Sequence, residues 1–403
     1  MARPSHLSTL RRRPRRAAQV KLLWENQSVS FNTSKIVTMV AMPQPAKPRN
    51  RRDERITVLE TLLVDGKVRL DESVCRNLTK RWANSAEQPT AVRIRAGFLR
   101  RDPPLTDQEL ADLNDAEDGE ISDYSRPELP RVPLLSQLAG RSKGIGLRLA
   151  LTLLFLAHTR RPDERNPSAV LPLHHDDDRP HGLIDLIANK AVHRDDEDGG
   201  RFAAVTRDNR LRQIRGALKL LADEAIGMVE LPSRGRGTRT MFRGVHLLTE
   251  TGTATTVPPR YVPPTNRADT VDLPIEFWTN GWVHVLTNRE IAMLLMLTDN
   301  QARTNPTEDT TGQQFDRWVS PKSRIVKYDL TRATWDTHRN LQEFGLIHTL
   351  VHENRRPDGT AIGGRQAGYT GPHRFRLTPE GFKEPALRTV LPLVKNSDID
   401  LTF

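Results

Sequence analysis

Residues 329–351 read DLTRATWDTHRNLQEFGLIHTLV, and residues 207–231 read RDNRLRQIRGALKLLADEAIGMVEL. Each stretch has the pattern of a polar, basic amphipathic helix that ends in a glycine followed by aliphatic residues, as at the start of a strand. An apolar helix precedes each stretch, and a basic turn with a short strand ending in Leu-Thr follows it. The order helix, helix, basic helix, hairpin thus occurs twice. It predicts a mainly α-helical, α+β fold with small β-hairpins.

Composition indicates the class of partner. The chain has 403 residues, enough for two or three domains with ordinary cores, and a formal net charge of +11. The excess of arginine favours a polyanionic partner, although an arginine-rich proteome explains it equally well. The single cysteine, Cys75, excludes an internal disulfide framework and a cysteine-based zinc site, and it fits a reducing cytoplasm. The longest apolar run, Leu147–Ala157, is too short to span a bilayer.

Changes in composition divide the chain into segments. Arginine and proline dominate residues 1–56, where Met39 and Met42 are alternative starts. Nine acidic residues and no Lys or Arg lie between Asp102 and Ser125, which is typical of a solvated linker. Two Pro-Pro pairs in Val257–Pro264 predict an interdomain linker. We expect a disordered basic tail at 1–56, a small segment of unassigned role at 57–101, an acidic linker at 102–132, a first domain at 133–251, a Pro-rich linker at 252–272, a second domain at 273–388 and a C-terminal tail at 389–403.

Local signals predict the elements up to the end of the first domain. Asp65-Gly66 predicts a hairpin within residues 57–101. Leu147–Thr159 is apolar nearly all round, as in a central buried helix, and residues 183–187 predict a short second helix. Thr206 is the expected N-cap of the basic helix, which runs to Asp223. The apolar residues of that helix fall three and four apart and predict one buried stripe: Leu211, Ile214, Leu218 and Leu221.

Capping signals mark the helices of the second domain. Thr287 and Glu290 match a capping box that opens an apolar helix at residues 289–297. Ser320 followed by Pro321 predicts the start of a second helix, and Thr331 is the expected N-cap of the third. Strands are expected at residues 347–351 and 373–377, and in the first domain at residues 228–231 and 241–248.

The second repeat resembles the winged-helix family. Ser323–Ile347 is similar to its helix-turn-helix, with a Leu-x-x-Phe-Gly-Leu-Ile exit into the wing, and LTPEGF at 377–382 resembles the close of the wing in bacterial members. The first repeat departs from this pattern in its longer exit, Ala225–Met228. Two such units are similar in architecture to the initiators of iteron-type plasmid replication. The resemblance implies two tandem winged-helix domains, both of which can contact repeated origin sequences. One of the two domains would also mediate dimerisation or contact with another protein.

A winged helix places one helix in the major groove, where side chains read base edges while flanking cations neutralise phosphates. On this basis we expect Arg207, Asn209, Arg210 and Arg332 to read bases. For each residue taken singly, a solvated surface side chain is an equal alternative. The full set of expected double-stranded DNA contacts is Arg207, Asn209, Arg210, Arg212, Arg215, Arg234, Arg236, Arg239, Lys322, Arg324, Lys327, Arg332, His338, Arg339, Arg355, Arg356 and Arg365.

We expect no catalytic residue, metal or cofactor. The chain has no Gly-x-x-x-x-Gly-Lys-Ser/Thr sequence, so origin melting would need a host helicase. His174, His175 and the acidic run Asp176–Asp178 form a candidate metal site, but adjacent histidines in a Pro-flanked insertion are more typical of a solvated loop. The histidine pair and tyrosine of rolling-circle nicking enzymes is not convincingly present.

The expected function is sequence-specific binding of duplex DNA in the bacterial cytoplasm, on a plasmid or the nucleoid, and not at a membrane. A plasmid or mobile-element replication initiator is the leading interpretation, and a winged-helix transcriptional regulator is its alternative. A metal-dependent nicking nuclease and a protein-binding winged-helix module are alternatives of other classes. The DNA sequence recognised, the oligomeric state and the choice between replication and transcription stay open.

Overall fold

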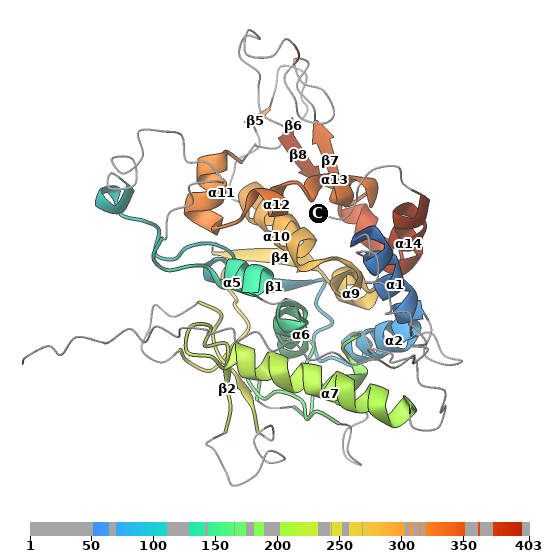
Figure 1. The fold of residues 1–403 in the computed structure, drawn as a ribbon. Coiled ribbons are helices and arrows are strands. Elements are labelled where there is room, and N and C mark those ends of the chain that lie inside the picture. The colour runs from blue at the N-terminus through green and yellow to red at the C-terminus, as the bar shows by residue number, and fades with distance from the viewer. Residues whose placement is uncertain are drawn as a thin grey trace, which may run out of the picture. The chain divides into compact units, whose positions relative to one another are not determined.

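The computed structural model describes residues 51–63, 70–110, 129–141, 144–164, 166–174, 181–188, 202–232, 242, 244–251, 258–267, 269–302, 307–308, 314–315, 319–350, 362 and 374–396. All of them belong to the unit Arg49–Phe403. This unit is mostly helical, and its described strands form small antiparallel pairs (Figure 1). The predicted α+β class is therefore confirmed at this level.

The N-terminal part of the unit does not form the predicted hairpin. Its elements are α1 (Arg51–Leu63), α2 (Leu70–Ala83), β1 (Ala91–Arg95) and α3 (Ala96–Leu99). The first strand of the predicted hairpin is wrong, because residues 58–63 are helical, whereas Asp65-Gly66 and residues 67–69 lie outside the described residues. The reason is tertiary: α1 packs against α14 (Ala386–Asn396) at the other end of the chain, and Leu59 and Leu62 are buried. Residues 51–56, expected in the tail, belong to α1.

The first repeat contains α5 (Leu134–Arg141), α6 (Gly146–His158), the 3₁₀ turn η1 (Leu183–Asp185), α7 (Phe202–Leu221), β2 (Val229–Glu230) and β3 (His246–Leu247). The apolar helix α6 is confirmed, but the second helix is a single 3₁₀ turn. Thr206 does not cap α7, which begins four residues earlier. β2 and β3 pair antiparallel, with Val229 opposite Leu247.

The second repeat is preceded by β4 (Thr270–Pro274), α8 (Glu276–Thr279) and α9 (Trp282–Val285). It contains α10 (Asn288–Ala302), β5 (Thr307–Glu308), β6 (Gln314–Phe315), α11 (Pro321–Tyr328), α12 (Arg332–Trp335), α13 (His338–Glu343), β7 (Ile347–Leu350) and β8 (Arg374–Leu377). The 3₁₀ turn η3 (Pro379–Lys383) and α14 follow. The third helix is thus split into α12 and α13, and residues 389–396, expected as tail, are helical.

The predicted caps of the second repeat are confirmed. The Thr287 N–H donates to Glu290 Oε2 at 2.8 Å, and the Glu290 N–H donates to Thr287 Oγ1 at 3.2 Å. The Ser320 side chain accepts from the Ser323 N–H, and Thr331 accepts from the Thr334 N–H. Each bond satisfies a helix N–H that has no partner within its own helix.

Helices from the two repeats pack around one hydrophobic cluster. α5 contacts α10, α6 contacts α9, and β1 pairs with β4, so that Ile94 lies opposite Val271. Part of the Pro-rich segment expected as a linker is packed here, because Tyr261 is fully buried and its N–H donates to the Leu247 carbonyl. The division into two domains stays a prediction, and the described parts of both repeats share this core.

Glu290 links three parts of this core. Its fully buried carboxylate accepts two hydrogen bonds from the Arg55 guanidinium, at 2.7 and 2.9 Å, and one from Asn340 Nδ2 at 2.7 Å. Arg55 belongs to α1 and Asn340 to α13. The residue that caps α10 therefore also holds α1 and α13 in place.

Candidate nucleic-acid interface

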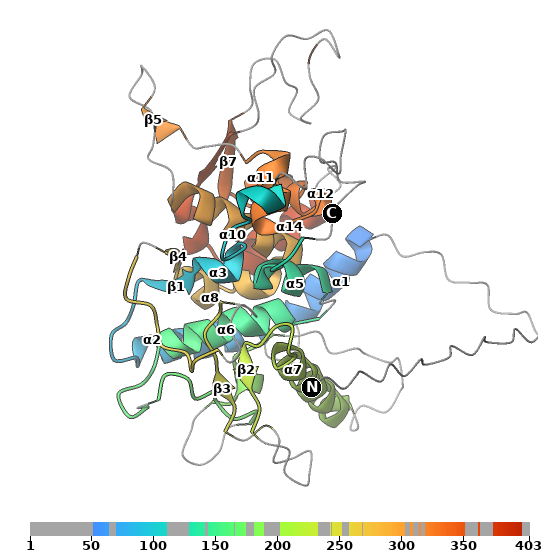
Figure 2. The same ribbon diagram turned by 90° about the vertical axis from the view of Figure 1, so that its left-hand side faces the viewer.

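One side of α7 packs on the protein and the other side is basic. The buried stripe is confirmed, since Leu211, Ile214, Leu218 and Leu221 are at most 4% exposed and α7 contacts α6 and η1. Figures 1 and 2 show α6 lying between α7 and α10. The helix carries five Lys or Arg and one Asp. Because the stripe is apolar, most of these charges lie on its outer side and flanks.

The outer side of α7 presents three cations within about two turns. Arg212 and Lys219 are exposed, and Arg215 is half-buried. Gly216 is exposed among them, and a Cβ atom added to it would meet no described atom within 4 Å. The protein's own packing therefore does not require glycine there. The surface is positive, and because glycine has no side chain the backbone of another molecule can approach the helix closely there.

The first turns of α7 contain the residues expected to read bases. Arg207 is exposed, and its Nη2 lies 3.2 Å from His174 Nδ1, while Asn209 is half-buried. Arg210 points inward instead, because its Nη2 donates to the carbonyl oxygens of Ile184 at 2.7 Å and Ile187 at 3.3 Å. Arg210 thus joins α7 to the η1 region, and its substitution would affect folding as well as any contact with DNA.

A second basic region includes α11. Lys322 and Lys327 are exposed, as expected of side chains that contact phosphates. Arg324 differs from its expected exposure: it is 3% exposed and its Nη1 donates to the Leu330 carbonyl. Arg324 therefore closes the C-terminal end of α11 and does not reach the surface.

Charges on α12 and α13 are more balanced. Arg332 is exposed, but its Nε pairs with Asp336 Oδ1 at 2.9 Å. Arg339 is half-buried. His338, expected on the exposed side, is 6% exposed and lies against Trp335 and Phe375, with its Nδ1 2.8 Å from the Trp335 carbonyl. His338 therefore packs α13 onto β8.

The β7–β8 hairpin presents cations that we did not expect from the sequence. Arg374 is exposed, Arg376 is half-buried, and exposed His348 lies opposite Arg376. Phe375, between the two arginines, is buried. Strand alternation could have predicted these cations. Residues two apart lie on the same face of a strand, so Arg374 and Arg376 share the face opposite to that of Phe375. The remaining expected DNA contacts, Arg234, Arg236, Arg239, Arg355, Arg356 and Arg365, lie outside the described residues.

The structure covers only part of the candidate metal site. His174 is half-buried beside Arg207, whereas residues 175–180 lie outside the described residues. Within the described ranges, no group of three or more His, Cys, Asp or Glu side chains is placed to hold a metal ion. The prediction that the protein is not an enzyme stays a prediction.

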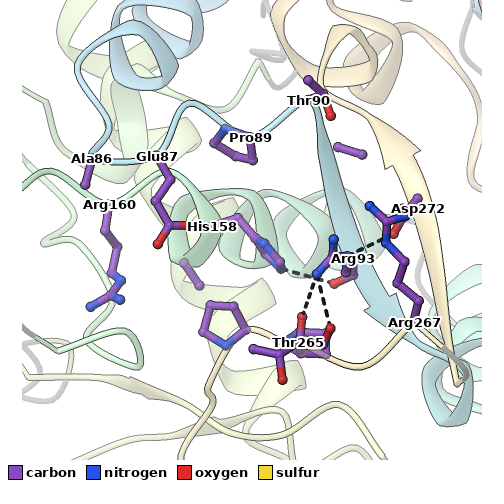
Figure 3. A pocket seen from close by; sticks show the side chains of 14 residues that line it. Ala86, Glu87, Pro89, Thr90, Arg93, His158, Arg160, Thr265, Arg267 and Asp272 are labelled. Carbon is purple, nitrogen blue, oxygen red and sulfur yellow. Dashed lines mark hydrogen bonds and ion pairs between the residues drawn. The ribbon is translucent and has the colours of Figure 1, made fainter.

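A pocket of about 470 Å³ lies where β1, the end of α6 and residues 263–265 meet (Figure 3). Its polar side chains largely satisfy one another. Arg93 approaches Asp272 at 3.4 Å and donates to the carbonyl of Thr265 at 3.4 Å, while His158 Nε2 lies 3.1 Å from the Arg93 carbonyl. Burial lowers the pKa of His158 to about 4, so the ring is neutral near pH 7. We interpret this pocket as a packed junction between β1 and the Pro-rich segment.

No family model, curated protein or solved structure matches this chain. Among the helices described, none has the length and apolar character needed to cross a membrane.

Proposed function

We propose that the protein binds duplex DNA through the outer side of α7. The observation that carries this proposal is the combination on one helix of a buried apolar stripe with Arg212, Arg215 and Lys219 on the other side. Cations along one side of a helix neutralise phosphates, and the major groove of duplex DNA admits a single helix. Exposed Gly216 favours close approach of the sugar-phosphate backbone.

Cations on two other elements supply further contacts. Lys322 and Lys327 lie on α11, and Arg374 and Arg376 lie on β8. The pairing of Arg332 with Asp336 lowers the net charge of α12, so we expect α7 to make the larger share of phosphate contacts. The resemblance to iteron-type initiators favours replication initiation as the biological role, with a transcriptional regulator as the alternative.

Salt dependence tests the binding proposal. If Arg207, Arg212, Arg215 and Lys219 each neutralise one phosphate, affinity for a short labelled duplex should fall on the order of 10²-fold between about 50 and 200 mM salt. Replacing Arg212 and Lys219 together by Glu should weaken binding by about tenfold or more and flatten the salt dependence. Fluorescence anisotropy on the full chain measures both.

The matched control carries the same change in charge elsewhere. Arg267 and Lys383 are exposed and lie outside the proposed surfaces, so replacing both by Glu should alter affinity much less than the α7 pair. Equal losses in the two variants would mean that net charge, and not α7, drives binding. A chain that does not bind duplex at low salt would overturn the proposal and favour a protein-binding module.

Footprinting on the DNA around the gene separates the two biological roles. Protection of several repeats in the same orientation supports an initiator. Protection of one inverted repeat within a promoter supports a regulator.

A further inference from the structure

A cavity of about 340 Å³ lies among α1, α2, α9 and α14, and none of its described lining residues belongs to α7 or to the β7–β8 hairpin. Apolar side chains make up much of its wall: Leu62, Ala188, Val285, Pro385 and Leu387. Sites for small organic ligands range from roughly 300 to 1,000 Å³ and are mostly apolar with a few polar groups. The cavity therefore has the size and lining of a site for a small ligand.

His284 lines this cavity, and no described residue forms a hydrogen bond with its ring. The side chain is 3% exposed, and neither Nδ1 nor Nε2 has a partner within the described part of the chain. Leaving a buried polar group unsatisfied costs about 1–3 kcal/mol, so the fold retains an unfavourable group that a ligand would satisfy. Burial lowers the pKa of His284 to about 3, helped by the charges of Arg148 and Arg210. The neutral ring offers one donor and one acceptor.

The exposed side of the cavity is positively charged. Arg76 on α2 and Arg388 on α14 line it and are both exposed, and no Asp or Glu is among the described lining residues. Asn280 shapes the wall, because its Nδ2 donates to the carbonyl oxygens of Phe382 and Lys383. An anionic group on the ligand would therefore lie at the rim and an apolar body within.

We propose that this cavity binds a small organic acid with an apolar body and a hydroxyl or carbonyl group at its far end. The carboxylate would lie near Arg76 and Arg388. The apolar body would pack against Leu62, Val285 and Leu387, and the polar group at the far end would hydrogen-bond to His284. This inference does not depend on DNA binding.

Three matched probes test the chemistry on the full chain: 4-hydroxyphenylpropionate, phenylpropionate, which lacks the hydroxyl, and tyramine, which replaces the carboxylate by a cation. We expect 4-hydroxyphenylpropionate to bind with a Kd of about 1 mM or tighter, phenylpropionate more weakly, and tyramine not measurably. Calorimetry measures affinity, and imidazole NMR signals report whether the first probe contacts His284.

Two variants and one control distinguish a site from a structural defect. His284→Leu should weaken 4-hydroxyphenylpropionate by about tenfold or more while leaving the fold equally or more stable, since it removes an unsatisfied polar group. Arg76→Glu changes an exposed residue, so it tests binding even if His284→Leu fails to fold, and it should abolish binding of both acids. His348→Leu on exposed β7 should change neither property.

The proposal is overturned if none of the probes binds up to millimolar concentration, or if tyramine binds as well as the acids. It is also overturned if Arg76→Glu keeps the affinity, or if the His284 signals do not move.

Discussion

One half-buried and one buried histidine make the stability of the fold depend on pH. Burial lowers the pKa of His158 to about 4 and of His284 to about 3, from an ordinary value of 6.5. Below about pH 6.5 the unfolded chain gains a proton at each position and the folded chain does not, so stability falls as the pH falls. Well below pH 6.5 each histidine contributes about 1.4 kcal/mol per pH unit, and the loss for both between about pH 6.5 and pH 5 is about 3 kcal/mol.

His284→Leu should remove about half of this loss. Urea unfolding of the variant and the unchanged chain at both pH values measures the difference. Burial raises the pKa of Glu250, which acts in the opposite direction and equally in both chains. The same dependence on pH in the variant would show that His284 is not a buried neutral group.

At the level of the helix, α7 carries a glycine that its own packing does not require. Gly216→Ala should raise the free energy of unfolding by about 0.5–1 kcal/mol, because alanine favours a helix and the added methyl group meets nothing. If a phosphate backbone approaches α7 there, the same methyl group should weaken duplex binding. Thermal unfolding and anisotropy measure the two effects on the same sample.

Gly140 provides the control for this substitution. It lies exposed in α5, and a Cβ atom there also meets nothing within 4 Å. Gly140→Ala should stabilise the fold by a smaller amount, since it lies in the last turn, and leave DNA affinity unchanged. Unchanged or higher affinity in Gly216→Ala would show that DNA does not approach α7 at this residue.

For the unit as a whole, we expect residues 51–101 to be necessary for cooperative folding. Deleting residues 1–48 should leave cooperative unfolding intact, whereas deleting residues 1–101 should abolish it. The second deletion removes β1 from β4, α1 from α14, and Arg55 from buried Glu290. Loss of one partner of a buried ion pair costs about 3–5 kcal/mol, against a typical total of 5–15 kcal/mol.

Circular dichroism and tryptophan fluorescence during urea unfolding measure this effect. Arg55→Ala serves as an intermediate variant, with a lowered midpoint but a cooperative transition. An unchanged midpoint for a chain that begins at residue 102 would contradict the assignment of this segment to the core.

The sequence alone predicted those features that depend on interactions within a few residues, namely helix caps and the apolar side of a helix. Thr287, Ser320 and Thr331 were predicted as caps because each capping bond spans only three residues, and the stripe of α7 was predicted because helical periodicity is local. The coarse fold class follows from the same signals. Thr206 failed as a cap because the helix continues favourably through it, back to Phe202.

Contacts between distant segments had no such signal. The pairing of β1 with β4, the packing of α1 on α14 and the link between Glu290 and Arg55 each join residues far apart in the chain. The inward orientation of Arg210 and His338 depends on a carbonyl group and a ring that only the folded chain brings to them, whereas Arg324 turns onto the nearby Leu330 carbonyl. Periodicity distinguishes apolar from polar positions. It does not show whether the side chain of a basic residue next to an apolar stripe points into the protein or toward solvent. Only the folded chain shows which arginines remain at the surface, because burial of a cation depends on acceptors supplied by other elements.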